Sequence, residues 1–359
     1  MRALVIPGVE SLHPYEAGKP IEEFVRERGI ADVIKLASNE NPFGPSPRAV
    51  EAMQAALHEA HRYPDAAAFR LREKLAEVHG VPMDEILQGN GSNELLELLV
   101  QTFATPDDHI VFADPSFVVY RMASLSHGVP FTAVPLRDLT HDLPAMAAAV
   151  TPRTRVMFIA NPNNPTGTYV GRAALEQLLR EVPAEVIVAM DEAYFEYADA
   201  PDFPDALAFR DLRERLVVLR TFSKVHGLAA LRVGYGIGPA RLIDYMNRVR
   251  QPFSVGTLGQ VAALAALEDS EHVERCVRLN RQERARLTQA LAGMGVRVPP
   301  SQANFVFMEL GRPGREVYEQ LLAKGVIIRP FGDTRFVRVT VGTPEENDRF
   351  LKAFSEVIP

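Results

Sequence analysis

Two patterns alternate through the middle of this chain, from residue 84 to about residue 250. Short apolar runs, rich in β-branched residues and bounded by Gly, Pro, Asn or Asp, are typical of buried strands. Most gaps between them hold helical patterns, with apolar residues three or four apart. Strands that alternate with helices predict a mainly parallel sheet covered on both faces, with ligands at the carboxyl ends of the strands. We expect seven strands, at 85–88, 109–113, 129–135, 155–160, 186–190, 216–220 and 233–237.

The pattern changes near residue 255, which indicates a second region. Long helical patterns at 257–268 and 271–293 lead into shorter strands and helices, an α+β arrangement. A chain of 359 residues also exceeds one typical domain. We therefore expect an N-terminal arm at 1–32 that packs with the small domain, a large domain at 33–254 and a small α+β domain at 255–359.

Composition argues against several classes of protein. A formal net charge of −7 is unlike a nucleic-acid binder, which usually presents a basic face. Cys276 is the only cysteine, so no intrachain disulfide forms and a reduced, cytoplasmic setting is expected. No apolar run approaches the roughly 20 residues of a membrane span, and we expect no signal peptide. His58 and His61 lack the spacing and third ligand of a zinc site, so no metal is expected.

A cluster of polar side chains follows the strand expected at 216–220: Thr221, Ser223, Lys224 and, eight residues beyond the lysine, Arg232. Burial lowers the pKa of an amine from about 10.4, because the charged form loses hydration. A neutral amine can hold an aldehyde as a Schiff base, and hydroxyls with an arginine suit a phosphate. Together they indicate pyridoxal phosphate, although a surface lysine after a strand would explain this stretch alone equally well.

The sequence Gly89-Asn90-Gly91-Ser92 follows an expected strand and opens a helix. Free backbone N–H groups and the helix dipole favour an anion there, but a lone Gly-x-Gly is weak evidence, and a tight turn capped by Ser92 is the alternative. Glu94 stands where a dinucleotide fingerprint has its third glycine, and no Gly-Lys-Ser/Thr occurs. The sequence therefore argues against a dinucleotide or nucleoside-triphosphate site.

Polar residues also follow two other strands. Asn164 lies in a turn fixed by prolines and a glycine, which leaves its amide free to meet a ligand. Asp191 closes the strand expected at 186–190, where a buried carboxylate is costly without a partner. A protonated pyridine nitrogen would be a suitable partner, and Tyr194 could donate to a phenolic oxygen of the same ring. A rigid turn, a helix cap and a core tyrosine are the alternatives.

Three further residues suit parts of the same ligand. Phe117 could lie flat on an aromatic ring, although such a residue is more often core. Arg338 projects from an alternating strand at 335–342, and an arginine there can hold a carboxylate or phosphate through two parallel bonds. Arg329 is a second candidate. An exposed strand edge would explain either arginine taken singly.

The order of these motifs resembles that of the fold-type I pyridoxal-phosphate aminotransferases. Gly-Asn-Gly-Ser, Asn-Pro-Thr-Gly, Asp-Glu-Ala-Tyr, Ser-Lys and Arg-Val-Thr-Val-Gly follow one another between about Tyr15 and Gly342. The resemblance is greatest to members that act on histidinol phosphate, a phosphorylated amino alcohol, with 2-oxoglutarate and glutamate as the other pair. Aromatic aminotransferases and threonine-phosphate decarboxylase share most of these motifs and stay open as alternatives.

The resemblance implies a role for each residue. Lys224 would hold the cofactor aldehyde and move a proton, Asp191 would pair with the ring nitrogen, and Tyr194 would help to hold the ring's O3′. The other residues implied to bind the cofactor are Ser92, Asn93, Phe117, Asn164, Thr221, Ser223, Arg232 and, from the second subunit of a homodimer, Tyr63. Those implied to bind substrate are Tyr15, Asn39, Asn164, Arg329 and Arg338.

Three positions depart from the family's usual pattern. Asn93 stands where aspartate is usual, Phe117 replaces a common tyrosine, and Ala230 replaces a glycine. Stacking by Phe117 survives the loss of a hydroxyl, and the backbone at Ala230 must tolerate a Cβ. None of the three touches the chemistry expected of Lys224 or Asp191.

Overall fold

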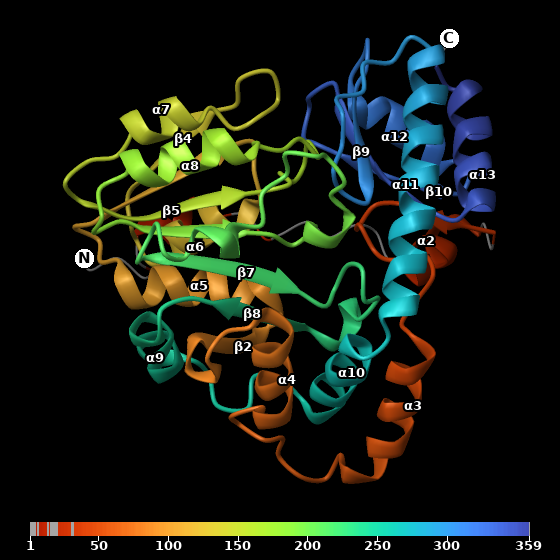
Figure 1. The fold of residues 1–359 in the computed structure, drawn as a ribbon. Coiled ribbons are helices and arrows are strands. Elements are labelled where there is room, and N and C mark those ends of the chain that lie inside the picture. Colours follow the sequence, from red (N-terminus) through yellow and green to blue (C-terminus); the bar gives the residue numbers. More distant parts are fainter. Residues whose placement is uncertain (1–4, 6, 13, 15–20, 30–31, 359) are drawn as a thin grey trace.

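The computed structural model describes residues 5, 7–12, 14, 21–29 and 32–358, and a seven-stranded sheet lies at its centre (Figure 1). In spatial order the strands are β2 (Ile86–Asn90), β8 (Val233–Ile237), β7 (Leu216–Thr221), β6 (Ile187–Asp191), β5 (Thr154–Ala160), β3 (His109–Asp114) and β4 (Phe131–Pro135). Strand β8 is antiparallel to β2 and β7, and the other neighbours are parallel. The predicted mainly parallel sheet is confirmed. The chain enters β8 without a long crossover helix, which antiparallel pairing permits.

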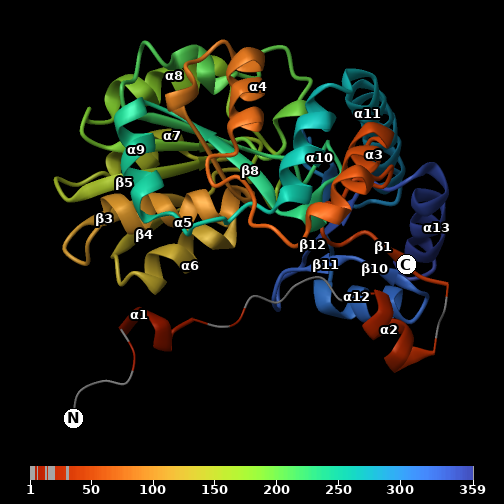
Figure 2. The same ribbon diagram turned by 90° about the horizontal axis from the view of Figure 1, so that it is seen from below.

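Helices cover both faces of this sheet, as predicted. Figure 2 shows α5 (Gly91–Phe103) and α6 (Val118–Ser126) on one face, where α9 (Ala240–Val249) packs into the same core, and α7 (Leu143–Ala148) and α8 (Arg172–Glu181) on the other. In β5, Val156 and Phe158 pack into the core on the α5 side, and Met157 and Ile159 into the core on the α8 side. Successive side chains of a strand point to opposite faces, so a strand buried on both sides is a continuous apolar run.

Three helices close the edge of the sheet at β2 and β8: α3 (Pro47–Ala56), α4 (Phe69–His79) and α10 (Thr257–Leu267). Figure 2 shows α10 beside α3. Ala262 of α10 and Leu75 of α4 share one buried cluster with Phe222, which follows β7. Helix α10 comes after the division expected at residue 254, and that division stays a prediction.

The C-terminal region carries two small sheets. One is antiparallel, in the order β11 (Arg329–Pro330), β12 (Phe336–Thr340), β9 (Phe305–Glu309), and the other pairs β1 (Ile34–Lys35) with β10 (Val326–Ile327) in parallel. Residues 326–330 therefore form two short strands that belong to different sheets. The helices here are α11 (Ser270–Gly293), α12 (Gly314–Leu322) and α13 (Pro344–Ser355).

The N-terminal segment meets the molecule at two places. Helix α2 (Ile21–Arg28) lies near α12, and its Phe24 packs with Leu322 and Ile327 (Figure 2). Helix α1 (Pro7–Glu10) lies beside α6. Short 3₁₀ turns complete the fold: η1 (Leu57–Glu59), η2 (Met83–Glu85), η3 (Phe195–Tyr197), η4 (Ala206–Phe209) and η5 (Ala229–Leu231). Among the helices of the described residues, none has the length and apolarity that crossing a membrane requires.

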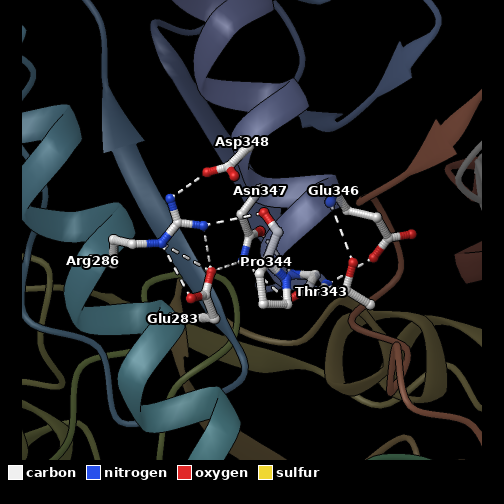
Figure 3. A network of polar contacts seen from close by, with 8 residues as sticks. Glu283, Arg286, Thr343, Pro344, Glu346, Asn347 and Asp348 are labelled. Atoms are coloured by element: carbon white, nitrogen blue, oxygen red, sulfur yellow. Dashed lines mark hydrogen bonds and ion pairs between the residues drawn. The ribbon is translucent and has the colours of Figure 1, made fainter.

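A polar network fixes the start of α13 against α11, immediately after β12 (Figure 3). The buried Asn347 accepts a bond from the N–H of Gly342 at 2.9 Å and donates to Glu283 of α11 at 2.7 Å. Arg286 bridges Glu283 and Asp348, at 2.6 and 2.5 Å. Gly342 lies two residues beyond the end of β12, which carries Arg338, so these bonds anchor the C-terminal end of that strand.

Candidate active site

A cavity of about 230 Å³ lies where the seven-stranded sheet meets the smaller antiparallel sheet. The carboxyl ends of β5, β6 and β7 reach it, as expected for neighbouring parallel strands. Most of the residues predicted to form the site line this cavity: Asn39, Ser92, Asn93, Phe117, Asn164, Asp191, Tyr194, Thr221, Ser223, Lys224, Arg232 and Arg338. Ser38, Ala160, Pro162 and Ala193 complete the lining.

Two of the predicted residues that the structure describes, Tyr63 and Arg329, do not line the cavity. Tyr63 is 82% exposed on the surface, where its ring stacks on Phe253. Arg329 is half-buried in β11, directly opposite Arg338 of β12 in the ladder. Tyr15 lies outside the described residues. The roles expected of these three, like those of the residues that line the cavity, stay predictions.

Lys224 stands at the end of the loop that leaves β7 and is half-buried in the cavity wall. Its Nζ lies 3.4 Å from the carbonyl oxygen of Ser38 and 5.5 Å from the centre of the Tyr194 ring. Burial, and to a lesser extent the nearby Arg338, lower the pKa of this amine to about 8. A substantial neutral fraction therefore exists at mildly alkaline pH, as a nucleophile or proton acceptor requires.

Asp191 ends β6 and is 4% exposed. Its Oδ2 accepts a hydrogen bond from the Tyr120 hydroxyl at 2.7 Å, whereas its Oδ1 has no hydrogen-bond partner among the described residues. Burial raises the pKa of the carboxyl, and the Tyr120 bond and the N–H of Ala193 oppose that rise. A buried acceptor with one unpaired oxygen at a cavity wall suits a cationic N–H donor, such as a protonated pyridine ring.

Groups that suit an anion gather where the cavity meets the N-terminus of α5. Ser92 belongs to the first turn of that helix, and Ser223 shares a hydroxyl–hydroxyl bond of 3.0 Å with Thr221. Arg232 comes within 3.4 Å of the Ser223 hydroxyl. Gly91 has a φ of +73°, and a Cβ on it would lie 2.5 Å from Nη2 of Arg232. Only glycine lets the guanidinium approach the open N–H groups of α5 so closely, and this cradle fits a phosphate.

The middle of the cavity holds aromatic and amide groups. Asn39 donates its amide to the Tyr194 hydroxyl at 2.9 Å, and Tyr194 packs edge-on against Phe305 at 5.1 Å. Phe117 lines the wall as the residue before α6, so a flat ring can lie against it. Asn164 accepts a hydrogen bond from Arg338.

Arg338 is the cation that the smaller sheet contributes to the cavity. Its side chain lies between the rings of Phe305 and Phe331, with the guanidinium carbon 5.1 and 5.8 Å from their centres. Its Nη2 donates to the carbonyl of Ala37 at 3.0 Å. These contacts fix a buried guanidinium at the cavity wall, ready for a carboxylate or phosphate.

A buried ion pair braces the sheet directly behind Asp191. Glu192 is fully buried and accepts two bonds from Arg220 of β7, at 3.0 and 2.8 Å. Arg220 also bonds Asp205 at 2.8 Å and lies 3.7 Å above the ring of Phe195. The nearby carboxylates raise the pKa of Arg220, so the guanidinium stays charged. This pair ties the ends of β6 and β7 together, and with them Asp191 and the Lys224 loop.

Sequence reasoning missed the contact between Tyr120 and Asp191. Tyr120 follows Phe117 by three residues and so lies about one helical turn away on α6, which was the available signal. The ion pair of Glu192 with Arg220 was missed as well, although both residues adjoin predicted site residues. In the described part of the chain, no group of three or more His, Cys, Asp or Glu side chains could hold a metal ion.

Comparison with known proteins points in one direction. The family model described as aminotransferase class I and II matches residues 31–354. The histidinol-phosphate aminotransferase of Moorella thermoacetica is 49% identical over 97% of this chain and 91% of the relative. Histidinol-phosphate aminotransferase 2 of Pseudomonas aeruginosa is 47% identical over 99% of this chain and 98% of the relative.

Solved structures show the same architecture. The histidinol-phosphate aminotransferase of Sinorhizobium meliloti in complex with pyridoxal-5′-phosphate has a TM-score of 0.91 and 26% identity, and the match covers 100% of this chain and 98% of that one. The Thermus thermophilus aspartate aminotransferase with maleate has a TM-score of 0.84 and 26% identity, over 99% and 100% of the two chains.

Proposed function

We propose that this chain, which belongs to the family of class I and II aminotransferases, transfers the amino group of L-histidinol phosphate to 2-oxoglutarate. The products are imidazole acetol phosphate and L-glutamate, as in histidine biosynthesis. Relatives that match nearly the whole chain at 44–49% identity carry the name histidinol-phosphate aminotransferase, which favours this activity over the aromatic aminotransferase and decarboxylase alternatives. The structural observation that carries the proposal is that Lys224 and Asp191, which has one oxygen without a hydrogen-bond partner among the described residues, line the same cavity.

The residues present fit pyridoxal 5′-phosphate. The cradle of α5, Thr221, Ser223 and Arg232 suits its phosphate, and the unpaired Oδ1 of Asp191 suits a protonated ring nitrogen. Phe117 would cover one face of the ring, and Asn164 and Tyr194 would bind O3′. When bound, this cofactor withdraws electrons from the bonds at the substrate's α-carbon and carries the amino group from one substrate to the next.

Lys224 acts as the covalent anchor and as the base. Because burial lowers its pKa to about 8, its Nζ can take a proton from the α-carbon of the amino substrate and later return it. Burial raises the pKa of Asp191, and the cationic ring nitrogen together with the Tyr120 hydroxyl would keep the carboxylate ionised against that effect. The reaction thus needs an amine made less basic by burial and a carboxyl that a cationic partner keeps charged.

The two substrates use the same cations in turn. Arg338 would bind the α-carboxylate of glutamate or, in the other half-reaction, the phosphate of histidinol phosphate, with Arg329, Tyr15 and Asn39 nearby in the proposed site. Arg338 is already oriented by Asn164 and Ala37, so binding costs little ordering of its side chain. A single site that serves both substrates requires a ping-pong order, in which the first product leaves before the second substrate enters.

The working enzyme is a homodimer with shared sites in this proposal. Tyr63 lies on the surface of its own chain and would reach the phosphate of the cofactor in a second copy. The expected arm at 1–32, large domain at 33–254 and small domain at 255–359 would move relative to one another around the cavity. The free, buried Cys276 supports a reduced, cytoplasmic location.

Half-reactions test the function. Purified holoenzyme is mixed with histidinol phosphate, glutamate or phenylalanine alone, and the visible absorbance of the bound cofactor is followed. We expect histidinol phosphate and glutamate to convert it and phenylalanine to convert it at least about 100-fold more slowly, since phenylalanine offers neither the phosphate of the first substrate nor the side-chain carboxylate of the second. Conversion by phenylalanine alone would favour the aromatic alternative. Release of carbon dioxide without a keto acid would favour the decarboxylase.

Covalent labelling tests the anchor. Borohydride reduction followed by peptide mapping is expected to place the cofactor on Lys224, and Lys224→Ala is the matched control. A label on another lysine would contradict the assignment. Protein that shows no yellow colour and no spectral change with added pyridoxal phosphate would favour a binding protein without catalytic activity.

A further inference from the structure

The hydroxyl of Tyr120 makes a single, short contact with the carboxylate of Asp191. Its Oη lies 2.7 Å from Oδ2, and both residues are buried. Tyr120 sits on α6 and Asp191 ends β6, so the bond crosses from the helical layer to the sheet. Burial and the adjacent carboxylate raise the pKa of the Tyr120 hydroxyl well above its usual value. The phenol therefore keeps its proton and is a permanent donor.

This contact makes the two oxygens of Asp191 different from each other. Oδ2 is occupied by Tyr120, whereas Oδ1 has no partner among the described residues, and Asp191 lines the cavity. A carboxylate with both oxygens free can rotate about its terminal torsion, which has broad, roughly two-fold minima. A donor on one oxygen fixes that torsion and directs the other oxygen to an incoming cation.

The ring of Tyr120 is itself held in place on two sides. It stacks flat on Phe158 of β5, with ring centroids 4.8 Å apart and planes 2° apart. Phe117 meets it edge-on at 6.0 Å and 86°. Since Phe117 lines the cavity where the cofactor ring is proposed to lie, Tyr120 contacts both the residue at the ring face and the residue at the ring nitrogen.

We propose that Tyr120 is a positioning residue: its hydroxyl orients the Asp191 carboxylate toward the ring nitrogen of the cofactor. The inference rests on the proposed function. In this inference Tyr120 contacts neither substrate nor cofactor and acts only through Asp191. Loss of its hydroxyl should therefore weaken binding only of a cofactor that has the ring nitrogen. A general contribution of Tyr120 to the core would affect any cofactor equally.

The test measures cofactor affinity in the cofactor-free protein with two ligands. One is pyridoxal 5′-phosphate, and the other is its analogue with C–H in place of the ring nitrogen. Tyr120→Phe keeps the stacked ring and removes only the hydroxyl. We expect it to weaken binding of pyridoxal 5′-phosphate about 10-fold or more, the usual effect of a lost hydrogen bond to a charged group, and to change binding of the analogue less than about 2-fold.

Two controls complete the design. Tyr169→Phe removes another tyrosine hydroxyl that donates to a carboxylate at 2.7 Å, that of Asp202; neither residue lines the cavity, and the variant is expected to leave both affinities unchanged. In the Asp191→Asn background, Tyr120→Phe is expected to add no loss, because the charged partner of the hydroxyl is gone. The inference is overturned if Tyr120→Phe weakens the binding of both ligands equally, or if it weakens the binding of neither. Wild-type protein that binds pyridoxal phosphate but does not convert histidinol phosphate overturns the proposed function alone.

Discussion

Tyr63 and Phe253 stack at the surface, with ring centroids 4.7 Å apart and planes at 24°. Phe253 has a φ of +59°, in the left-handed region that large side chains seldom adopt. The backbone beside Tyr63 is tied down from the same side, since Gln260 donates to the carbonyl of Asp65 at 2.9 Å and Arg250 to that of Ala66 at 2.8 Å. These contacts hold an exposed aromatic ring in one orientation, which is what a residue offered to a second copy of the chain requires.

Mixed dimers test whether Tyr63 serves the site of the partner. We expect Lys224→Ala to be inactive and Tyr63→Ala to bind cofactor about 10-fold more weakly, for the loss of a hydrogen bond to a phosphate. Co-expressed with different affinity tags and isolated as the mixed dimer, the two variants should recover one intact site, measured as turnover at limiting cofactor. If Tyr63 acts in its own chain, no site in the mixed dimer is intact and activity does not recover.

Much of the central sheet could be predicted because its strands are buried on both faces. Val156 and Met157 point to opposite cores, so β5 has no polar face and appears in the sequence as a continuous apolar run. The polar residues at the ends of these strands could be predicted for a related reason. Asp191 and Thr221 follow apolar runs directly, and parallel strands bring such ends to one edge.

Other features depend on contacts that the sequence does not display. Tyr120 has the spacing of a core aromatic in α6, and only its contact with Asp191, 71 residues away, gives its hydroxyl a role. The segment after residue 325 is one apolar run, yet β10 pairs with β1 and β11 with β12, because two different sheets border it. Pairing partners of this kind are set by tertiary packing, which overrides local propensity.

The lowered pKa of Lys224 predicts a measurable pH dependence. The rate at which cofactor-free protein captures pyridoxal phosphate should rise with pH and level off above about 8, since only the neutral amine attacks. Stopped-flow absorbance across pH 6.5 to 9.5 measures this rate. A rate that still rises steeply at the top of this range would show an amine of ordinary basicity and contradict the prediction.

The lowered pKa of Lys224 also predicts how the free energy of unfolding changes with pH. The folded pKa of Lys224 lies below the unfolded value of 10.5, so the unfolded chain binds more protons between about pH 8 and 10.5. The free energy of unfolding of the cofactor-free protein therefore gains a contribution as pH rises through this window. Lys224→Met lacks the titrating group, and urea unfolding of both proteins should show a smaller rise for the variant.

Arg338→Gln tests the proposed substrate cation. Loss of a buried guanidinium that pairs with a carboxylate costs about 2–5 kcal/mol, so we expect the second-order rate of the glutamate half-reaction to fall at least about 30-fold. Arg335→Gln is the matched control, because Arg335 is exposed and pairs with Glu309 at 2.8 Å, away from the cavity. Equal rates for Arg338→Gln and wild type would remove Arg338 from the site.

Arg220→Met tests how far the ion pair behind Asp191 supports the fold. Arg220 and Glu192 have side chains only 5% and 0% exposed, so removal of one leaves the other charge buried and should lower the free energy of unfolding by about 3–5 kcal/mol. Arg180→Met is the control, since Arg180 pairs with Glu176 at 2.7 Å on an exposed helix face, and such pairs contribute about 0.3–0.5 kcal/mol. Urea denaturation of the cofactor-free proteins measures both. Equal losses in the two variants would show that water reaches the Glu192 carboxylate. In that case apolar packing and the backbone hydrogen bonds of the sheet hold the ends of β6 and β7 together, and the pair of Arg220 with Glu192 does not brace the cavity.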